Sequence, residues 1–162
     1  MRSKICDLEG LQRIVSSNKK LGRKVGATSG CFDILHAGHV MYLEEARSLC
    51  DFLIVLLNSD RSVRGLKGAE RPVNTQEDRA TVLSALACVD LVHVFDEATP
   101  CGIYAAIRPD IIIKGGDYRG KHIPEMDTAA SYGGKVVFAD LLAGRSSTGI
   151  IERIRQHTGV SI

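Results

Sequence analysis

Two histidines, His36 and His39, lie three residues apart in the segment TSGCFDILHAGHVMYL, which spans residues 28–43. If the chain begins a helix here, both rings project to the same side. Gly30 and Gly38 allow the main chain to approach a ligand closely, and the start of a helix presents unpaired N–H groups and partial positive charge. Imidazoles can donate to phosphate oxygens and stabilise negative charge in a transition state. The pattern therefore indicates an anion-binding site.

Two other interpretations of this segment are open. Cys31, Asp33, His36 and His39 could in principle supply four ligands to zinc, although ligands drawn from nine residues across a strand-to-helix turn face awkward tetrahedral geometry. An isolated pair of histidines three residues apart can also have no function.

Further charged residues follow other apolar segments. Lys67 and Arg71 are flanked by Gly65 and Gly68, which indicates either a mobile lid that folds over a phosphate or a solvated loop. Lys114 ends an apolar segment and runs into Gly115, Gly116 and Asp117, a turn of nearly bare backbone.

A second candidate phosphate-binding site opens the last predicted helix, at Arg145, Ser146, Ser147 and Thr148. Hydroxyl groups and helix N–H groups there stand beside a guanidinium. Plain N-capping is the alternative for one of the two serines.

The order of elements predicts an α/β, doubly wound fold: a five-stranded, mainly parallel sheet with helices on both faces. Ligands bind such sheets beyond the carboxyl ends of the strands, which is where the residues above lie. Strands are expected at KVGAT, FLIVLLN, LVHVF, DIIIK and KVVFA. Helices are expected from Asp7 to Gly22, from about Leu35 to Leu49, from Asn74 or Thr75 onward, over Asp127–Tyr132 and over Ser147–His157. A further helix is expected after Thr99, with Thr99 as its cap and Pro100 in its first position. Ser59–Val73 is expected to be a polar loop.

Length and composition set the class of protein. The 162 residues suit one domain, 1–162, with 1–22 as an N-terminal helical extension. A net charge of +2 is too balanced for a nucleic-acid-binding surface. No apolar run is long enough to span a membrane, and no apolar stretch follows the basic N-terminus, so we expect a cytoplasmic protein without a membrane partner. The five scattered cysteines are expected to be free thiols.

Several motifs in order resemble the cytidylyltransferase-like nucleotidyltransferases, and among them most closely the heptose 1-phosphate adenylyltransferases. The motifs are GCFDILHAGH, NSD, LKGAERPVN followed by EDR, KGGDY and RSST, and the resemblance covers Val25 to about Ile154. It implies a Rossmann-like nucleotidyltransferase fold and a reaction in which a sugar 1-phosphate attacks the α-phosphorus of ATP, giving ADP-heptose and pyrophosphate. It also implies Mg²⁺ with the ATP, a separate kinase that supplies the sugar 1-phosphate, and a homodimer.

The resemblance implies roles for single residues as well. His36 and His39 would bind the triphosphate and stabilise the transition state, and Lys67, with Arg71 nearby, would bridge phosphates of the two substrates. Asp33 would orient the sugar phosphate or a magnesium-bound water, and Asp117 would touch the sugar or the base. Nucleotide contacts are expected from Cys31, Phe32, Gly38, Lys114, Gly115, Arg145, Ser146, Ser147 and Thr148. Arg79 fits either a phosphate contact or a structural ion pair.

Two alternatives to this function stay open on sequence grounds. One is a CTP-dependent cytidylyltransferase acting on glycerol 3-phosphate or another sugar phosphate, because base choice depends largely on backbone contacts. The other is a nucleotide sensor without catalytic activity.

Overall fold

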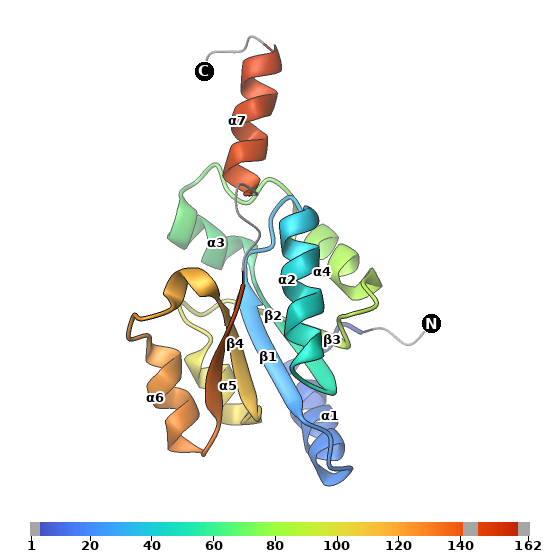
Figure 1. The fold of residues 1–162 in the computed structure, drawn as a ribbon. Coiled ribbons are helices and arrows are strands. Elements are labelled where there is room, and N and C mark those ends of the chain that lie inside the picture. The colour runs from blue at the N-terminus through green and yellow to red at the C-terminus, as the bar shows by residue number, and fades with distance from the viewer. Residues whose placement is uncertain (1–3, 141–145, 159–162) are drawn as a thin grey trace.

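A five-stranded sheet forms the centre of the protein (Figure 1). The computed structural model describes residues 4–140 and 146–158. The strands lie in the order β3-β2-β1-β4-β5, and every neighbouring pair is parallel. Their bounds are β1 Val25–Gly30, β2 Phe52–Asn58, β3 Leu91–Phe95, β4 Ile111–Gly115 and β5 Lys135–Ala139. The predicted doubly wound α/β fold is confirmed, and the described sheet is parallel throughout.

Helices cover both faces of this sheet. Leu43 of α2 and Leu83 of α4 are in the core on one face, and Leu11 of α1, Tyr104 of α5 and Ala129 of α6 are in the core on the other. The helices are α1 Leu8–Lys20, α2 Ala37–Ser48, α3 Asp60–Lys67, α4 Gln76–Ala85, α5 Cys101–Ile107, α6 Pro124–Ser131 and α7 Ser147–Thr158, with a 3₁₀ turn at Gly116–Tyr118.

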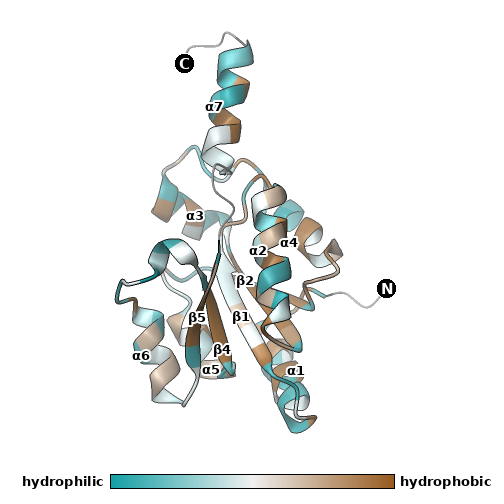
Figure 2. Ribbon diagram, in the orientation of Figure 1, coloured by the Kyte–Doolittle hydropathy of each residue, from teal (hydrophilic) through white to brown (hydrophobic). Residues whose placement is uncertain are grey.

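The central strand β2 shows why the sheet is buried on both sides. Its residues from Leu53 to Leu57 are completely buried, and they alternate between the two cores. A continuous apolar run is typical of a parallel strand whose two faces are both covered. Figure 2 shows the same hydrophobic character along β4.

The polar segment Ser59–Val73 is not the loop that the sequence predicts. Ser59 accepts a hydrogen bond from the amide of Ser62 and caps α3, which runs to Lys67 before Gly68 ends it with a φ of 95°. Ser and Asp at the start of a helix satisfy its unpaired amides and its dipole, and here they outweigh the exposed Gly65. The predicted mobile lid is therefore partly a helix that holds Lys67 at its last position.

Two other helix starts differ from the predictions. Pro100 is the N-cap residue of α5 and not its first helical residue, and no side chain caps that helix, so Thr99 is not its cap. Helix α6 begins at Pro124, three residues before the predicted Asp127, because proline is well suited to the first turn.

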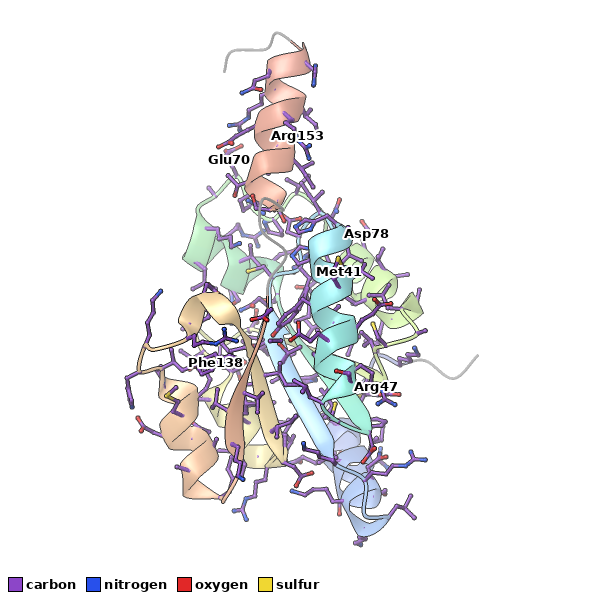
Figure 3. All side chains as sticks on the ribbon, viewed as in Figure 1. Met41, Arg47, Glu70, Asp78, Phe138 and Arg153 are labelled. Carbon is purple, nitrogen blue, oxygen red and sulfur yellow. The ribbon has the colours of Figure 1, made fainter. Side chains whose placement is uncertain are left out.

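Helix α7 extends away from the sheet at the end where α2 begins (Figure 1). The opposite end of α2 carries Arg47, which is labelled in Figure 3. Within the described residues, no helix is both long and apolar enough to cross a membrane.

Candidate active site

A cavity of about 430 Å³ opens at the carboxyl edge of the sheet, where β1 and β4 lie side by side. The strand order reverses at this point, because β1 leads to β2 on one side while β4 lies on the other. Such a switch point is where doubly wound sheets bind ligands. Of the predicted site residues, the cavity is lined by Cys31, Phe32, Asp33, His36, Gly38, His39, Lys67, Lys114, Gly115, Asp117, Ser146, Ser147 and Thr148. Arg71 lies outside this lining, and Arg145 lies outside the described residues.

His36 is the N-cap residue of α2. Its Nδ1 accepts a hydrogen bond of 3.1 Å from the amide of Gly38, and its carbonyl accepts from the amide of His39 at 2.9 Å. Because Nδ1 is the acceptor, Nε2 carries the proton of the neutral ring. The cap thus fixes which nitrogen can donate to a ligand.

The two histidine rings are stacked, with 3.9 Å between their centroids and 23° between their planes. Burial, followed by the neighbouring His36 and Lys67, lowers the pKa of His39 to about 4, although Asp33 opposes the shift. His39 is therefore neutral at pH 7. Its Nδ1 is shielded from solvent and has no hydrogen-bond partner among the described residues, which leaves a polar atom for a ligand to satisfy.

Asp33 sits in a backbone turn that L-residues rarely adopt. Phe32 and Ile34 on either side have φ values of 44° and 52°, and positive φ is especially unfavourable for a β-branched residue. The Asp33 side chain is 1% exposed and pairs with Arg71 Nε at 2.8 Å. Its two oxygens also accept from the amides of Val73, at 2.9 Å, and Asn74, at 3.0 Å.

These contacts tie Asp33 to the structure of the site, whereas Arg71 keeps a buried Nη2 that has no hydrogen-bond partner among the described residues. Burial favours a higher pKa for Asp33, but hydrogen bonds from Asn74, Val73 and Arg71 outweigh it and lower the pKa below its ordinary value. Both carboxylate oxygens accept hydrogen bonds from within the protein. This geometry favours a structural role for Asp33 over the expected role of orienting the substrate or a metal-bound water.

Arg79 is a structural residue and not a phosphate contact. It is 3% exposed, and its guanidinium donates to Asp60 at 2.8 Å, to the Cys31 carbonyl at 2.5 Å and to the Asn74 carbonyl at 3.1 Å. It thereby ties the start of α3 to the turn after β1 and fixes the base of the helix that ends at Lys67.

Lys114 enters the cavity from β4 with its charge already balanced. Its Nζ lies 2.8 Å from Glu125 of α6, in a pair whose side chains are 12% and 9% exposed. The same Nζ lies 4.9 Å from the centre of the Tyr118 ring. The β4 side of the cavity is therefore aromatic and close to neutral, except for the exposed Asp117.

The two serines at the start of α7 have different roles. Ser146 Oγ accepts from the amide of Gly149 at 3.0 Å, so this serine is the N-cap. Ser147 Oγ donates to the backbone carbonyl of Asp33. Thr148 also lines the cavity and makes no hydrogen bond through its hydroxyl to another described residue.

The geometry gives no support to the zinc interpretation. No group of three His, Cys, Asp or Glu side chains in residues 4–140 and 146–158 is arranged to hold a metal ion. Burial also raises the pKa of Cys31, against the lowering effects of Lys67 and Arg79, so its thiol stays protonated at neutral pH and lines the cavity.

The cavity lining also contains two tyrosines, Tyr42 and Tyr118, that the sequence did not point to. Tyr42 donates to the Ile113 carbonyl at 3.1 Å and shares a 2.7 Å hydrogen bond with Thr28, so it joins β4 to β1 beneath the site. It lies one helical turn after His39, a spacing that could have indicated it. Tyr118 adjoins Asp117 in the KGGDY motif, but its contact with Lys114 depends on the fold.

Comparisons with known proteins place this geometry in a family. A model of cytidylyltransferase-like proteins matches residues 27–153. The bifunctional protein HldE of Syntrophotalea carbinolica is 49% identical over 152 residues, which are 94% of this chain and 31% of that protein. HldE of Mesorhizobium japonicum is 53% identical over 151 residues, 93% of this chain and 30% of that protein. The chain spans about a third of the length of these relatives.

Solved structures share the fold. The lipopolysaccharide core biosynthesis protein from Thermoplasma volcanium has a TM-score of 0.61 and 28% identity, covering 75% of this chain and 98% of that one. Pantoate-beta-alanine ligase from Francisella tularensis, crystallised with beta-gamma ATP and beta-alanine, has a TM-score of 0.62 and 15% identity, covering 96% of this chain and 78% of that one. The second likeness concerns the fold alone. Since the family model matches most of the sequence, the chain belongs to the cytidylyltransferase-like family.

Proposed function

We propose that this protein is a nucleotidyltransferase that transfers AMP from ATP to a heptose 1-phosphate, giving ADP-heptose and pyrophosphate. A phosphate oxygen of the sugar forms a bond to the α-phosphorus of ATP. The bond from that phosphorus to the oxygen bridging the β-phosphorus breaks, and pyrophosphate leaves with the electron pair. The single observation that carries the proposal is the stacked pair His36 and His39 at the start of α2, over the cavity at the switch point.

A neutral His39 suits this reaction. His39 is uncharged at pH 7 because its pKa is about 4, so it binds by donating or accepting hydrogen bonds. The capping bond directs the donor of His36 to Nε2. Hydrogen bonds to the equatorial oxygens strengthen as charge builds on the five-coordinate phosphorus, and this difference between ground state and transition state accelerates the reaction.

The charges divide the cavity into two parts. On one side of the cavity, Lys67 supplies a positive charge, and the N-termini of α2 and α7 supply unpaired N–H groups and partial positive charge. On the β4 side Glu125 balances Lys114, and Asp117 adds a negative charge that can face phosphate only across a bound cation. The phosphates therefore belong beside the histidines and Lys67, and an uncharged part of a substrate belongs against Tyr118.

The carboxylates suit a divalent cation that arrives with the nucleotide. Mg²⁺ is usually bound by one or two carboxylates together with substrate phosphates and water. Asp117 lines the cavity and makes no hydrogen bond or ion pair with another described residue, whereas Asp33 is engaged. When bound, the cation neutralises charge on the triphosphate, and Asp117 is the residue that we assign to it.

The choice of ATP and heptose is supported by the relatives. Proteins named HldE are about half identical to this chain over nearly its whole length, and the Thermoplasma volcanium structure is named for lipopolysaccharide core biosynthesis. No such support favours the CTP-dependent alternative.

Pyrophosphate release tests the proposal. The protein is incubated with Mg²⁺ and either ATP or CTP, together with heptose 1-phosphate, glucose 1-phosphate or glycerol 3-phosphate. Release with ATP and heptose 1-phosphate alone is the expected result. Release with CTP and glycerol 3-phosphate would replace the proposal by the alternative, and nucleotide binding without release in any mixture would favour a sensor.

A further inference from the structure

Asp33 bonds to two segments that are distant in the sequence: residues 71–74, which follow the cavity-lining Lys67, and the start of α7, which lines the cavity itself. Its carboxylate accepts from the side chain of Arg71 and from the amides of Val73 and Asn74. Its backbone carbonyl accepts from the hydroxyl of Ser147. One residue therefore holds the segment that follows Lys67 and the first turn of α7 at the same time.

The bonds act on a backbone that is unfavourable by itself. Phe32 and Ile34 both have positive φ, and such conformations persist only where surrounding contacts determine them. Asp33 lies between these two residues and is almost completely buried. Removing a contact from either side of Asp33 therefore weakens the restraint on the whole turn, including the contact on the other side.

We propose that Asp33 is a positioning residue that couples the ordering of the 71–74 segment to the ordering of the first turn of α7. When one segment is held in place, the turn around Asp33 is also held in place. The other segment is then ordered more readily. Coupling of this kind is reciprocal, so a perturbation on either side reaches the other. The coupling is a property of the ligand-free protein. Its consequence for substrates, which is that each favours binding of the other, rests on the proposed function.

Hydrogen exchange of the ligand-free protein tests the coupling directly. Ser147→Ala removes the bond to the Asp33 carbonyl and touches none of residues 71–74. We expect the exchange rates of the Val73 and Asn74 amides to rise at least threefold in this variant. Thr148→Ala is the matched control, because it removes from the same turn a hydroxyl that makes no hydrogen bond to another described residue. Its Val73 and Asn74 amides should exchange as in the wild type.

Asp33→Asn tests the reverse direction. The Asp33 carboxylate makes no hydrogen bond to a described residue of α7, yet its loss should raise exchange of the Gly149 and Ile150 amides, which bond to Ser146 in the wild type. If Ser147→Ala changes exchange only in α7 and at Asp33, the proposal is overturned. If Asp33→Asn fails to fold, the comparison of Ser147→Ala with Thr148→Ala still decides the question.

A kinetic measurement then separates this coupling from a general loss of structure. In the wild type, saturation with ATP should lower the KM for the sugar phosphate at least threefold, and in Asp33→Asn this mutual effect should disappear. A merely structural defect lowers the fraction of active enzyme and leaves the mutual effect intact, which would overturn the proposal. If the protein shows no transferase activity, the proposed function fails, while the exchange experiment still tests the coupling.

Discussion

Acidification from pH 7.5 to 5.0 should destabilise the wild-type protein through His39. The pKa of this histidine is lowered to about 4 in the folded protein, chiefly by burial, whereas an unperturbed histidine has a pKa of about 6.5. Between these two pH values the unfolded chain binds a proton at His39 that the folded protein does not. The free energy of unfolding therefore falls as the pH falls below about 6.5.

The size of the effect follows from the shift. From pH 6.5 to 5.0 the loss accumulates at about 1.4 kcal/mol for each pH unit, which gives about 2 kcal/mol. Water screens part of the shift because the ring is only partly buried, so we expect a loss of about 1 to 2 kcal/mol from this residue.

Urea unfolding followed by circular dichroism at pH 7.5, 6.5 and 5.0 measures this loss. His39→Gln lacks the titrating group and should not lose this stability on acidification. The free energy of unfolding of the variant minus that of the wild type should therefore rise by about 1 to 2 kcal/mol from pH 7.5 to pH 5.0. His122→Gln removes an exposed histidine of the loop before α6 and leaves His39 in place, so it should keep the loss. A constant difference between wild type and His39→Gln across this range would refute the assignment of a neutral His39.

Three further substitutions test the division of the cavity. His39→Ala should lower kcat by about a hundredfold while circular dichroism stays unchanged, because a transition-state donor is lost; full activity would remove His39 from the mechanism. Lys67→Ala should raise the KM for the phosphorylated substrates about tenfold, as expected for one charge-assisted hydrogen bond, and an unchanged KM would return Lys67 to a solvated surface role. Lys114→Met should lower the free energy of unfolding by about 3 to 5 kcal/mol by leaving Glu125 buried and unpaired, and Lys114→Met with Glu125→Met should recover most of it. Equal losses in the single and double variants, measured by urea unfolding, would show that the pair is not the cause.

Much of the fold could be predicted because its signals are local. The buried run from Leu53 to Leu57 needs only its apolar side chains to indicate a covered strand, and the alternation of strands and helices then indicates the sheet. The spacing of His36 and His39 correctly predicted that the rings share one side of a helix start. Helix α3 was missed because its charged residues and Gly65 resemble a loop, while the capping by Ser59 that stabilises it is a single residue.

The parts that could not be predicted depend on partners that are distant in the sequence. The hydrogen bonds from the amides of Val73 and Asn74 to Asp33 could not be predicted, because these amides belong to another segment. Lys114 looked like a free cation, because nothing in the sequence pairs it with Glu125 across an intervening turn. Whether a charged side chain pairs within the protein or is available to a ligand therefore becomes clear only when its neighbours in the fold are known.

The position of an oxygen label tests the central claim most directly. Heptose 1-phosphate carrying ¹⁸O in its phosphate group is incubated with ATP and Mg²⁺, and the products are analysed by mass spectrometry. Attack of the sugar phosphate on the α-phosphorus predicts that all of the label is found in ADP-heptose and that the pyrophosphate is unlabelled. A labelled heptose bisphosphate formed together with ADP, which requires attack on the γ-phosphorus, would contradict it.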